Sequence, residues 1–508
     1  MKKVFITTPI FYVNDIPHIG HAYTSIVCDV LARFYSLKDY EVKFITGTDE
    51  HGLKVEKAAN EKKINPQSFV DKISSNFMEL TRTLKITNTD FIRTTQNRHK
   101  NAVINFWKKL LENNQIYLDN YEGWYSVKDE TFYQEKELIK KDGEFFTQDG
   151  GEVEWIKEES YFFKLSAWEK KLLDYYEKNP EFILPKSRSN EVISFVKQGL
   201  KDLSISRNSF TWGIQVPNNP EHIIYVWIDA LTNYLSVLGY PNFDESSDKY
   251  WENSIHVIGK DILKFHAIYW PSMLMAAGLN PPKKIFAHGW WTNEGKKISK
   301  SLGNTIDPNL LVQKYGLDQL KYFLLREVPL GQDGDFSENA FINRVNADLS
   351  NSLGNLVQRT IKFSNKHFKN EFPSELNEDS LECEVLKKGY SLIINFEKKM
   401  IAFEFHKAID EIWKFIYRLN QFIDKVEPWA TIKKDRNLTA LNISILIEAL
   451  RLIGILIAPI IPESSNNILN ILNIDKDKRS FKFYSKKYLI KKGKKINEPK
   501  QIFPRISI

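Results

Sequence analysis

The first 46 residues contain a strand, a helix and a second strand, and this order constrains the fold more than any other feature. Residues 4–8 and 41–46 have the β-branched, alternating pattern of strands. Between them, apolar residues recur at helical spacing over residues 21–38. Because strands joined by a helical crossover pair in parallel, the sequence predicts an α/β fold with a parallel sheet.

The remaining sequence predicts further domains, since 508 residues are too many for one hydrophobic core. Short aromatic runs alternate with glycine and charged turns in residues 117–205, which is typical of a small inserted domain. The α/β pattern resumes with strands expected at 222–228 and 254–258. Amphipathic helices are predicted at 339–368, 381–398, 403–425 and 438–457, which favours a helical bundle. The expected domains are 1–116 and 206–338 (two halves of the α/β domain), 117–205 (insert), 339–474 (bundle) and 475–508 (tail).

Composition excludes several classes of protein. The chain is 42% hydrophobic and 27% charged, as globular proteins are and disordered proteins are not. Its two cysteines, Cys28 and Cys383, cannot form a disulfide framework or a cysteine-rich zinc knuckle, which favours the cytoplasm. No secretory or transit signal is expected at the N-terminus. The most apolar run, 446–462, is interrupted by Glu448 and Arg451, so a buried helix and no membrane span is expected.

The C-terminal residues 475–508 concentrate positive charge. They hold 12 Lys or Arg and three Asp or Glu, although the whole chain has a net charge of only +7. This asymmetry indicates a polyanionic partner, with a solvated lysine-rich surface as the alternative. Aromatic and aliphatic residues lie among the lysines, so the tail is expected to pack back on the body in an ordered form.

A Pro-His-Ile-Gly-His sequence at residues 17–21 stands where the first strand gives way to the first helix. A helix N-terminus offers unpaired N–H groups and the positive end of the helix dipole, which bind phosphates. His18 and His21 can donate hydrogen bonds to phosphate oxygens, and Gly20 lets a flat base approach the backbone. The alternative is that the motif is two unrelated surface histidines.

Residues 295–304, Gly-Lys-Lys-Ile-Ser-Lys-Ser-Leu-Gly-Asn, form a basic loop bounded by glycines. Lysine ammonium groups suit a triphosphate whose charge moves during reaction. A loop with glycine at both ends can close over a leaving pyrophosphate and reopen. Taken alone, the loop could equally be a solvated basic surface.

His-Ile-Gly-His at 18–21 and Lys-Ile-Ser-Lys-Ser at 297–301 together resemble the two signatures of class I aminoacyl-tRNA synthetases. Ile298 stands where methionine is usual, but both side chains are apolar. Further stretches narrow the resemblance to the methionyl-tRNA synthetase family: Thr-Thr-Pro-Ile-Phe-Tyr-Val-Asn at 7–14, Thr-Gly-Thr-Asp-Glu-His-Gly at 46–52, Tyr-Val-Trp-Ile-Asp-Ala at 225–230, Gly-Lys-Asp-Ile at 259–262, Phe265-His266 and His288-Gly289.

The resemblance implies a Rossmann-type catalytic domain with a parallel sheet, interrupted by an inserted connective domain and followed by an all-α anticodon-binding bundle. The implied activity is that of a methionine–tRNA ligase. It would activate L-methionine with ATP, bound with Mg²⁺, to methionyl-adenylate and pyrophosphate. It would then transfer methionine to the 3′-terminal adenosine of tRNA(Met), both initiator and elongator.

The resemblance also assigns roles to residues. The catalytic set is His18, His21, Lys297 and Lys300. The ATP-binding set adds Gly20 at the adenine, Asp261 at the ribose and Arg207 at the phosphates. The methionine pocket is Ile10, Tyr12, Asp49, Trp227, Ala230, Tyr234, Ile262 and His266. The anticodon residues are Asn355, Arg359, Pro428 and Trp429, which without the resemblance would be ordinary surface or packing residues.

The sequence departs from many relatives in having no cysteine in the insert, so no structural zinc and no other resident metal is expected. Because the chain ends soon after the bundle, a monomer is expected. Competing hypotheses are a nucleotidyltransferase with a His-x-Gly-His turn, and a non-catalytic RNA-binding relative. A class I synthetase for leucine, isoleucine, valine or cysteine is the third.

Overall fold

The computed structural model describes residues 2–13, 16–126, 131–133, 135–141, 143–298, 304–381 and 383–507. They form two compact units. The N-terminal unit comprises Lys3–Cys28 and Val42–His288, and the C-terminal unit comprises Met1–Lys2, Asp29–Glu41 and Gly289–Ile508. The five domain boundaries expected from the sequence stay a prediction.

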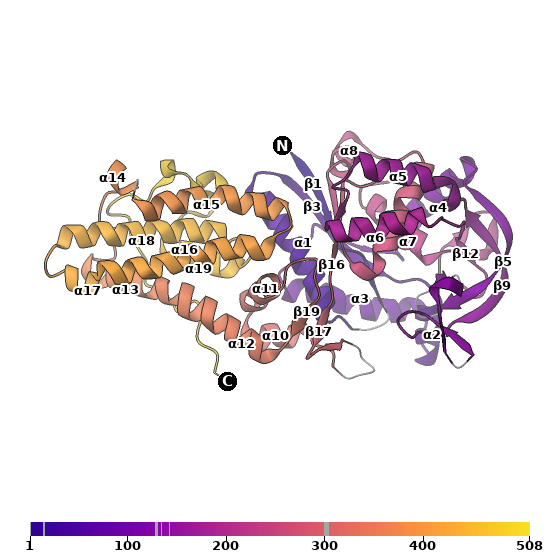
Figure 1. Cartoon of the computed structure of the whole chain (residues 1–508), viewed down its shortest axis with the longest axis horizontal. Coiled ribbons are helices and arrows are strands. Elements are labelled where there is room, and N and C mark those ends of the chain that lie inside the picture. The colour runs from indigo at the N-terminus through magenta and orange to yellow at the C-terminus, as the bar shows by residue number, and fades with distance from the viewer. Residues whose placement is uncertain are drawn as a thin grey trace. The chain divides into compact units, whose positions relative to one another are not determined.

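A parallel sheet forms the centre of the N-terminal unit (Figure 1). Among the described residues its seven strands are β10 (Ile183–Leu184), β16 (Lys284–His288), β15 (Ser254–Gly259), β1 (Lys3–Thr7), β3 (Glu41–Asp49) and β2 (Phe11–Tyr12) in that order, with β4 (Asp90–Arg93) also on β3. β15 pairs in parallel with β1 and β16, and β3 pairs in parallel with β2 and β4. The predicted parallel sheet is confirmed.

The order of the strands fixes where a ligand can bind. From β1 the chain crosses to β3 on one side, and it later returns to β15 on the other side of β1. The carboxyl ends of β1 and β15 therefore flank a topological switch point, where open α/β sheets bind their ligands. After β1 and the short β2, His18 precedes α1 and His21 lies in its first turn, while Asp261 lies in the short helical turn after β15.

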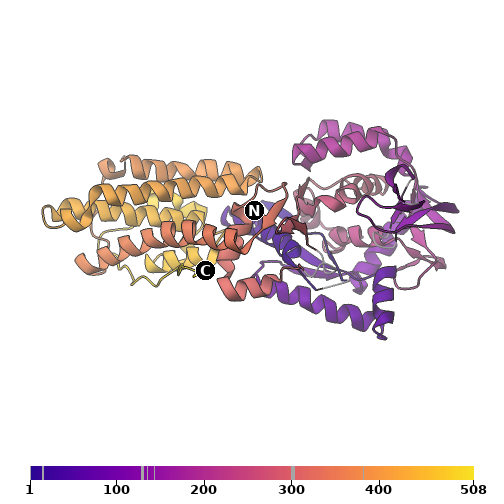
Figure 2. The same ribbon diagram turned by 60° about the horizontal axis from the view of Figure 1, so that its bottom comes forward.

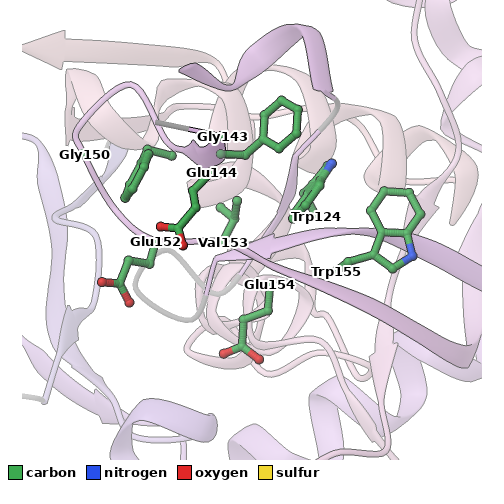
Figure 3. Close-up of a pocket in the computed structure, with 10 residues that line it drawn as sticks. Trp124, Gly143, Glu144, Gly150, Glu152, Val153, Glu154 and Trp155 are labelled. Carbon is green, nitrogen blue, oxygen red and sulfur yellow. The ribbon is translucent and has the colours of Figure 1, made fainter. Parts of the chain in front are cut away.

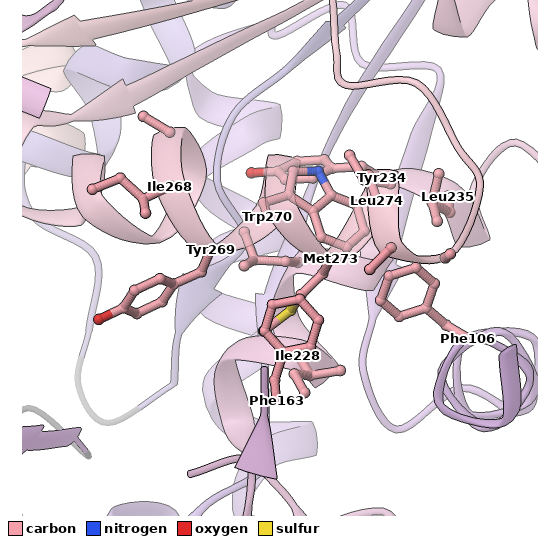
Figure 4. Close-up of a cluster of buried hydrophobic side chains, with 14 of the residues drawn as sticks. Phe106, Phe163, Ile228, Tyr234, Leu235, Ile268, Tyr269, Trp270, Met273 and Leu274 are labelled. Atoms are coloured by element: carbon pink, nitrogen blue, oxygen red, sulfur yellow. The ribbon is translucent and has the colours of Figure 1, made fainter. Parts of the chain in front are cut away.

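Helices cover this sheet and bury a core rich in aromatic residues. They are α1 (Ile19–Leu37), α2 (Leu53–Glu61), α3 (Pro66–Thr83), α4 (Asn97–Glu112), α7 (Val226–Ser236), α8 (Glu245–Trp251) and α9 (Trp270–Ala276). Figure 4 shows Phe106 of α4, Tyr234 of α7, and Trp270 and Met273 of α9 in one buried cluster. Removing this apolar surface from water is the main source of stability for the unit.

The strand expected at residues 222–228 is wrong in its second half. β14 (Asn219–Ile224) ends before Tyr225, and Val226 to Ile228 form the first turn of α7. β14 also pairs antiparallel with β12 (Ser206–Arg207) and β13 (Gln215–Val216), outside the parallel sheet. The reason is burial: α7 is enclosed almost all round, so its apolar run has no polar face and resembles a buried strand.

The insert is antiparallel. β5 (Ile116–Ser126) and β9 (Glu154–Phe163) pair along ten residues, with β6 (Thr131–Tyr133) and β11 (Leu203–Ser204) at the edges. A separate hairpin joins β7 (Ile139–Lys141) and β8 (Glu144–Phe146). Helices α5 (Glu169–Lys178) and α6 (Lys186–Lys197) lead back towards the parallel sheet.

The C-terminal unit contains a small sheet and a helical bundle. Within the described ranges, β17 (Trp291–Asn293) pairs with β18 (Lys296–Lys297) and β19 (Gly334–Phe336). The helices are α10 (Pro308–Tyr315), α11 (Leu317–Arg326), α12 (Glu338–Arg344), a π-helical segment (Val345–Gly354), α13 (Asn355–His367), α14 (Glu378–Leu381), α15 (Glu384–Ile401), α16 (Phe405–Val426), α17 (Pro428–Thr431), α18 (Arg436–Leu456) and α19 (Pro462–Ile471). Figure 2 shows the long helices α15, α16 and α18 running alongside one another. The predicted bundle is confirmed.

Helix α18 is the core of this bundle. By length and composition it could cross a membrane, but 83% of its most apolar window is buried inside the protein. It carries a buried ion pair in which Arg451 Nη2 donates to Glu448 Oε1 at 2.5 Å. Arg451 Nη1 also donates to the carbonyl of Phe483 at 2.6 Å, and the Tyr484 hydroxyl donates to the carbonyl of Gly389 at 2.6 Å. These bonds attach the basic tail to α15 and α18.

Candidate active site

The two histidines of the first motif face each other at the start of α1. Their ring centroids are 4.0 Å apart. The backbone N–H of His18 donates to Nδ1 of His21, and the backbone N–H of Gly20 donates to Nδ1 of His18, each at 3.1 Å. Because each Nδ1 accepts a hydrogen bond, each neutral ring carries its proton on Nε2. The turn thus presents two Nε2–H donors beside a helix N-terminus.

The environment keeps His21 neutral. Burial, and then the neighbouring His18, lower the pKa of His21 well below its usual value. Its ring stands edge-to-face with Phe11 at 5.0 Å and with Phe77 at 5.2 Å. A neutral imidazole held between two rings can donate a hydrogen bond from a fixed position.

Glycines make room on both sides of the switch point. A Cβ on Gly20 would lie 2.9 Å from Cε1 of His18, so a side chain would push that ring away. A Cβ on Gly259, at the end of β15, would lie 2.5 Å from Oδ1 of Asp261. The Asp261 carboxylate is exposed and folds back over the end of its own strand.

The proposed methionine residues on α7 meet those that follow β15. Trp227, Ala230 and Tyr234 lie on α7, which confirms their helical spacing. The Tyr234 hydroxyl donates to Nε2 of His266 at 2.8 Å, and Nδ1–H of His266 donates to the carbonyl of Ile262 at 3.0 Å. The two bonds fix one tautomer of His266, and burial lowers the pKa of His266 to about 4. The imidazole is therefore neutral near pH 7.

Phe265 contacts Trp227 of this group, although the resemblance assigned no role to Phe265. Its ring stacks on the Trp227 indole with centroids 3.7 Å apart and 5° between the planes. Trp227 also stands edge-to-face with His266 at 6.3 Å. The signal in the sequence was the Phe265-His266 pair, which matched the family but was given no separate role.

The other residues that the resemblance assigns to methionine lie at or beside β2 and at the end of β3. Tyr12 of β2 and Asp49 of β3 are register partners, and the backbone N–H of Val13 donates to the carbonyl of Asp49 at 3.1 Å. Asp49 is 8% exposed. Ile10 and Tyr12 are partly buried against the same core cluster as Trp227 and Ile262.

For three further residues assigned to ATP, the structure shows no position at the histidine turn. Arg207, on β12, donates to Ser204 Oγ at 2.8 Å and to the carbonyl of Ser206 at 2.6 Å, and its guanidinium stacks 4.8 Å from the Tyr225 ring centroid. Lys297 ends β18 in the C-terminal unit. Lys300 falls outside the described residues. Their contacts with ATP stay predictions.

Three of the four residues that the resemblance assigns to the anticodon come together on the bundle. Arg359 of α13 donates to Asp424 Oδ1 at 2.5 Å, and its guanidinium carbon lies 5.5 Å from the Trp429 ring centroid. Trp429 is 48% exposed, whereas Pro428 beside it is buried at the start of α17. Asn355 is exposed in the first turn of α13.

A cavity of about 840 Å³ lies in the insert and not at the histidine turn (Figure 3). Trp124, Trp155 and Glu144 are among its lining residues. In the parts of the chain that the structure describes, no group of three or more His, Cys, Asp or Glu side chains is placed to hold a metal ion. The expectation that the insert lacks zinc stays a prediction.

Comparisons with known proteins extend over nearly the whole chain. The family model for class I tRNA synthetases (M) matches residues 4–143 and 146–361, and that for the anticodon binding domain of methionyl tRNA ligase matches 373–507. The methionine–tRNA ligase of Rickettsia conorii is 51% identical, with 99% of each chain covered. That of Brucella suis is 45% identical, covering 99% of this chain and 98% of its own. A structure of Mycobacterium tuberculosis methionyl-tRNA synthetase in complex with methionyl-adenylate has a TM-score of 0.96 and 42% identity, covering 99% of this chain and 100% of that one.

Proposed function

The chain belongs to the methionyl-tRNA synthetase family of class I aminoacyl-tRNA synthetases, and we propose that the residues at the carboxyl ends of β1, β3 and β15 carry its reaction. The activity is that of an ATP-dependent methionine–tRNA ligase. Methionine and ATP give methionyl-adenylate and pyrophosphate, and methionine then passes to the 3′-terminal adenosine of tRNA(Met). The match to this family over nearly the whole chain argues against the three competing hypotheses: a nucleotidyltransferase, a non-catalytic RNA-binding relative and a synthetase for another amino acid.

The observation that carries the methionine site is the hydrogen-bonded, neutral His266 beside the Trp227–Phe265 stack. A thioether is apolar and accepts hydrogen bonds only weakly, so shape and aromatic contact must select it. The stacked rings of Trp227 and Phe265 and the uncharged imidazole of His266 form such an apolar surface, which we call the aromatic wall. Ile10, Tyr12, Ala230, Tyr234 and Ile262 complete the pocket, and Asp49 pairs with the methionine ammonium.

The phosphate chemistry belongs to the histidine turn and the lysine loop. The methionine carboxylate attacks the α-phosphorus, and pyrophosphate leaves with the bonding electron pair. The reaction needs stabilisation of charge more than covalent help. His18 and His21 donate from Nε2 to the ATP phosphates, Gly20 accommodates adenine, and Asp261 accepts from the ribose hydroxyls. Lys297 and Lys300 neutralise the leaving pyrophosphate, Arg207 contacts the phosphates, and Mg²⁺ enters with ATP.

The decisive test is ATP–pyrophosphate exchange with each amino acid in turn, on the wild type and on Lys300→Ala. We expect the strongest exchange with methionine and a loss of at least 100-fold in the variant, about the cost of removing one transition-state donor. Exchange with another amino acid would overturn the pocket. If the folded protein showed no exchange with any amino acid, the result would favour a non-catalytic RNA-binding protein.

The helical unit binds tRNA through the anticodon, with Asn355, Arg359, Pro428 and Trp429 as the reading residues. Arg359 sits over the Trp429 ring, so a splayed base can stack on an indole already held in place. We expect both initiator and elongator tRNA(Met) to be charged. Aminoacylation of each purified tRNA tests this.

The basic tail adds non-specific affinity for tRNA. Lys486, Lys487, Lys491 and Lys492 are exposed, while Ile490 among them is 5% exposed and anchors the segment. Deleting the tail would remove buried apolar side chains, so substitution of these four lysines by glutamine is the cleaner test. We expect weaker tRNA binding and a shallower dependence on salt, with unchanged pyrophosphate exchange. An unchanged salt slope would make the lysines a solvated surface.

The enzyme is also proposed to act as a cytoplasmic monomer without zinc. Light scattering should give a mass near 59.5 kDa. Metal analysis of the purified protein should find less than one zinc per chain. A dimer mass, or stoichiometric zinc, would contradict these two points.

A further inference from the structure

One buried carboxylate in the N-terminal unit accepts hydrogen bonds from two histidines. Nδ1–H of His51 donates to Asp229 Oδ2, and Nε2–H of His99 donates to Asp229 Oδ1, each at 2.6 Å. The other nitrogen of His99 lies 3.0 Å from Oγ of Ser236. All four side chains are at most 5% exposed. The reaction as proposed above uses none of them.

The three groups come from three different elements. His51 follows the end of β3, two residues beyond Asp49. His99 lies on α4. Asp229 lies on α7, between Trp227 and Ala230 of the proposed methionine pocket. The cluster therefore connects the end of β3 to the helix that forms the aromatic wall.

The residue between Asp49 and His51 is anchored separately. The Arg93 guanidinium donates to both carboxylate oxygens of Glu50, at 2.6 and 3.0 Å, and the Thr95 hydroxyl donates at 2.5 Å. Glu50 thus fixes the strand end to the neighbouring β4, whereas His51 fixes it to α7. The bond of His51 is thus a direct link between the end of β3, where Asp49 lies, and the helix that carries Trp227.

The Asp229 carboxylate is ionised at neutral pH. Burial alone would raise its pKa, but the charges and hydrogen bonds of His51 and His99 outweigh burial and lower the pKa of Asp229 to about 2. A buried anion that loses a donor is strongly destabilised. Without His51, the Asp229 carboxylate would keep the His99 donor, and α7 would shift to improve its remaining hydrogen bonds. The position of α7 therefore depends on His51.

We propose that His51 is a positioning residue for methionine, which acts through Asp229 to set the spacing between Asp49 and the Trp227 wall. This rests on the proposed assignment of the ammonium to Asp49 and of the side chain to Trp227. An extended methionine reaches a set distance from its ammonium to its terminal S-methyl group, and the S-ethyl group of ethionine reaches further. A pocket held at one length discriminates against ethionine, which is longer by one methylene, whereas a loosened pocket does not.

The test compares two substitutions at His51. His51→Leu removes the donor, whereas the amide nitrogen of His51→Asn stands close to the place of Nδ1 and can still donate to Asp229. We expect His51→Leu to raise the KM for methionine about ten- to hundredfold, the effect of one lost hydrogen bond to a charged group. The KM for ATP should stay within about twofold, and the preference for methionine over ethionine should fall. His51→Asn should recover most of both losses.

A matched control separates positioning from loss of stability. Leu110→Ala removes most of a buried side chain of α4, in the core cluster on which Trp227 packs, and this hydrocarbon side chain takes no part in the hydrogen bonds of His51, His99 and Asp229. We expect a similar fall in Tm with an unchanged KM for methionine. If His51→Leu does not fold, His51→Gln replaces it, since its amide stands one bond further out and cannot take the place of Nδ1.

Two results would overturn the proposal. One is a rise in the KM for ATP equal to the rise for methionine. The other is an equal effect of Leu110→Ala on methionine. Failure of the proposed function itself is distinguishable, because the wild type would then show no methionine-dependent exchange.

Discussion

The Trp227 indole lies flat on the Phe265 ring, with centroids 3.7 Å apart and 5° between their planes. Trp227 lies on α7, and Phe265 begins a π-helical segment (Phe265–Tyr269) beyond the end of β15. Stacking therefore joins two elements that are separate in the sequence. The indole cannot rotate without losing this contact.

Phe265→Leu should loosen the indole and weaken methionine binding. An aromatic pair contributes about 0.5–1.5 kcal/mol beyond its buried area, so the KM for methionine should rise about two- to tenfold. Pyrophosphate exchange at varied methionine measures this. Phe243→Leu is the control, because Phe243 packs on the same core cluster through Tyr240. Equal effects of the two substitutions would contradict a specific role for the stack.

Protonation of His266 should make the enzyme sensitive to acid. An unfolded histidine has a pKa of about 6.5, whereas burial lowers the pKa of His266 to about 4. The unfolded state thus binds more protons between these pH values, and stability falls as the pH falls from 6.5 to 4. The full contribution is about 3 kcal/mol.

His266→Gln tests this prediction, since its amide oxygen can still accept from Tyr234. Urea unfolding between pH 7 and pH 4 should show a shallower loss of stability in the variant, by about one proton. His21 and His256 also have pKa values lowered by burial, so the remaining slope keeps its sign. Parallel curves for the two proteins would contradict the assignment.

Periodicity predicted the long helices well. The stretch 403–425 is α16 (Phe405–Val426), and 438–457 is α18 (Arg436–Leu456). Each has enough turns for apolar positions to recur unmistakably. The same reasoning failed at α7, because a helix buried on every side has no polar face. It also could not find the π-helical segment Val345–Gly354, which depends on packing and not on composition.

In the candidate site too, the sequence could locate some residues and not others. His18, Gly20 and His21 lie within four consecutive residues, so a single turn holds them and the sequence could locate that turn. His51 and Asp229 lie in the stretches 46–52 and 225–230 that resemble the family. However, His51 is 48 residues from His99 and 178 from Asp229, and no local pattern indicates that the three side chains meet. Only tertiary packing brings them together. Phe265 was adjacent to an assigned residue but had no pattern of its own to indicate stacking.

Trp429→Ala should weaken tRNA binding and leave amino-acid activation unchanged. Stacking of a base on an aromatic ring contributes about 1–3 kcal/mol, so the KM for tRNA(Met) should rise about five- to 150-fold. Arg359→Ala should act in the same direction, because its guanidinium lies over that ring. Ile394→Ala is the control, as Ile394 is 71% exposed on α15 and has no assigned role. A change in pyrophosphate exchange would contradict the separation of the two functions.

Arg451→Met should destabilise the helical bundle and release the tail. It leaves the Glu448 carboxylate buried without its cation and removes the bond to the Phe483 carbonyl. Breaking a buried pair costs about 3–5 kcal/mol, measurable by urea unfolding of the full chain. Trypsin should then cut the lysine-rich tail faster. Arg82→Met is the matched control, because the Arg82–Glu79 pair has the same spacing but is exposed and contributes at most about 1 kcal/mol.

Glu448→Leu combined with Arg451→Met should recover part of that loss, since it removes both buried charges together. Recovery will be incomplete because the Tyr390 hydroxyl, which donates to Glu448 at 2.8 Å, loses its acceptor. A double variant less stable than Arg451→Met would show that Glu448 contributes to the bundle by its own hydrogen bonds more than by its charge.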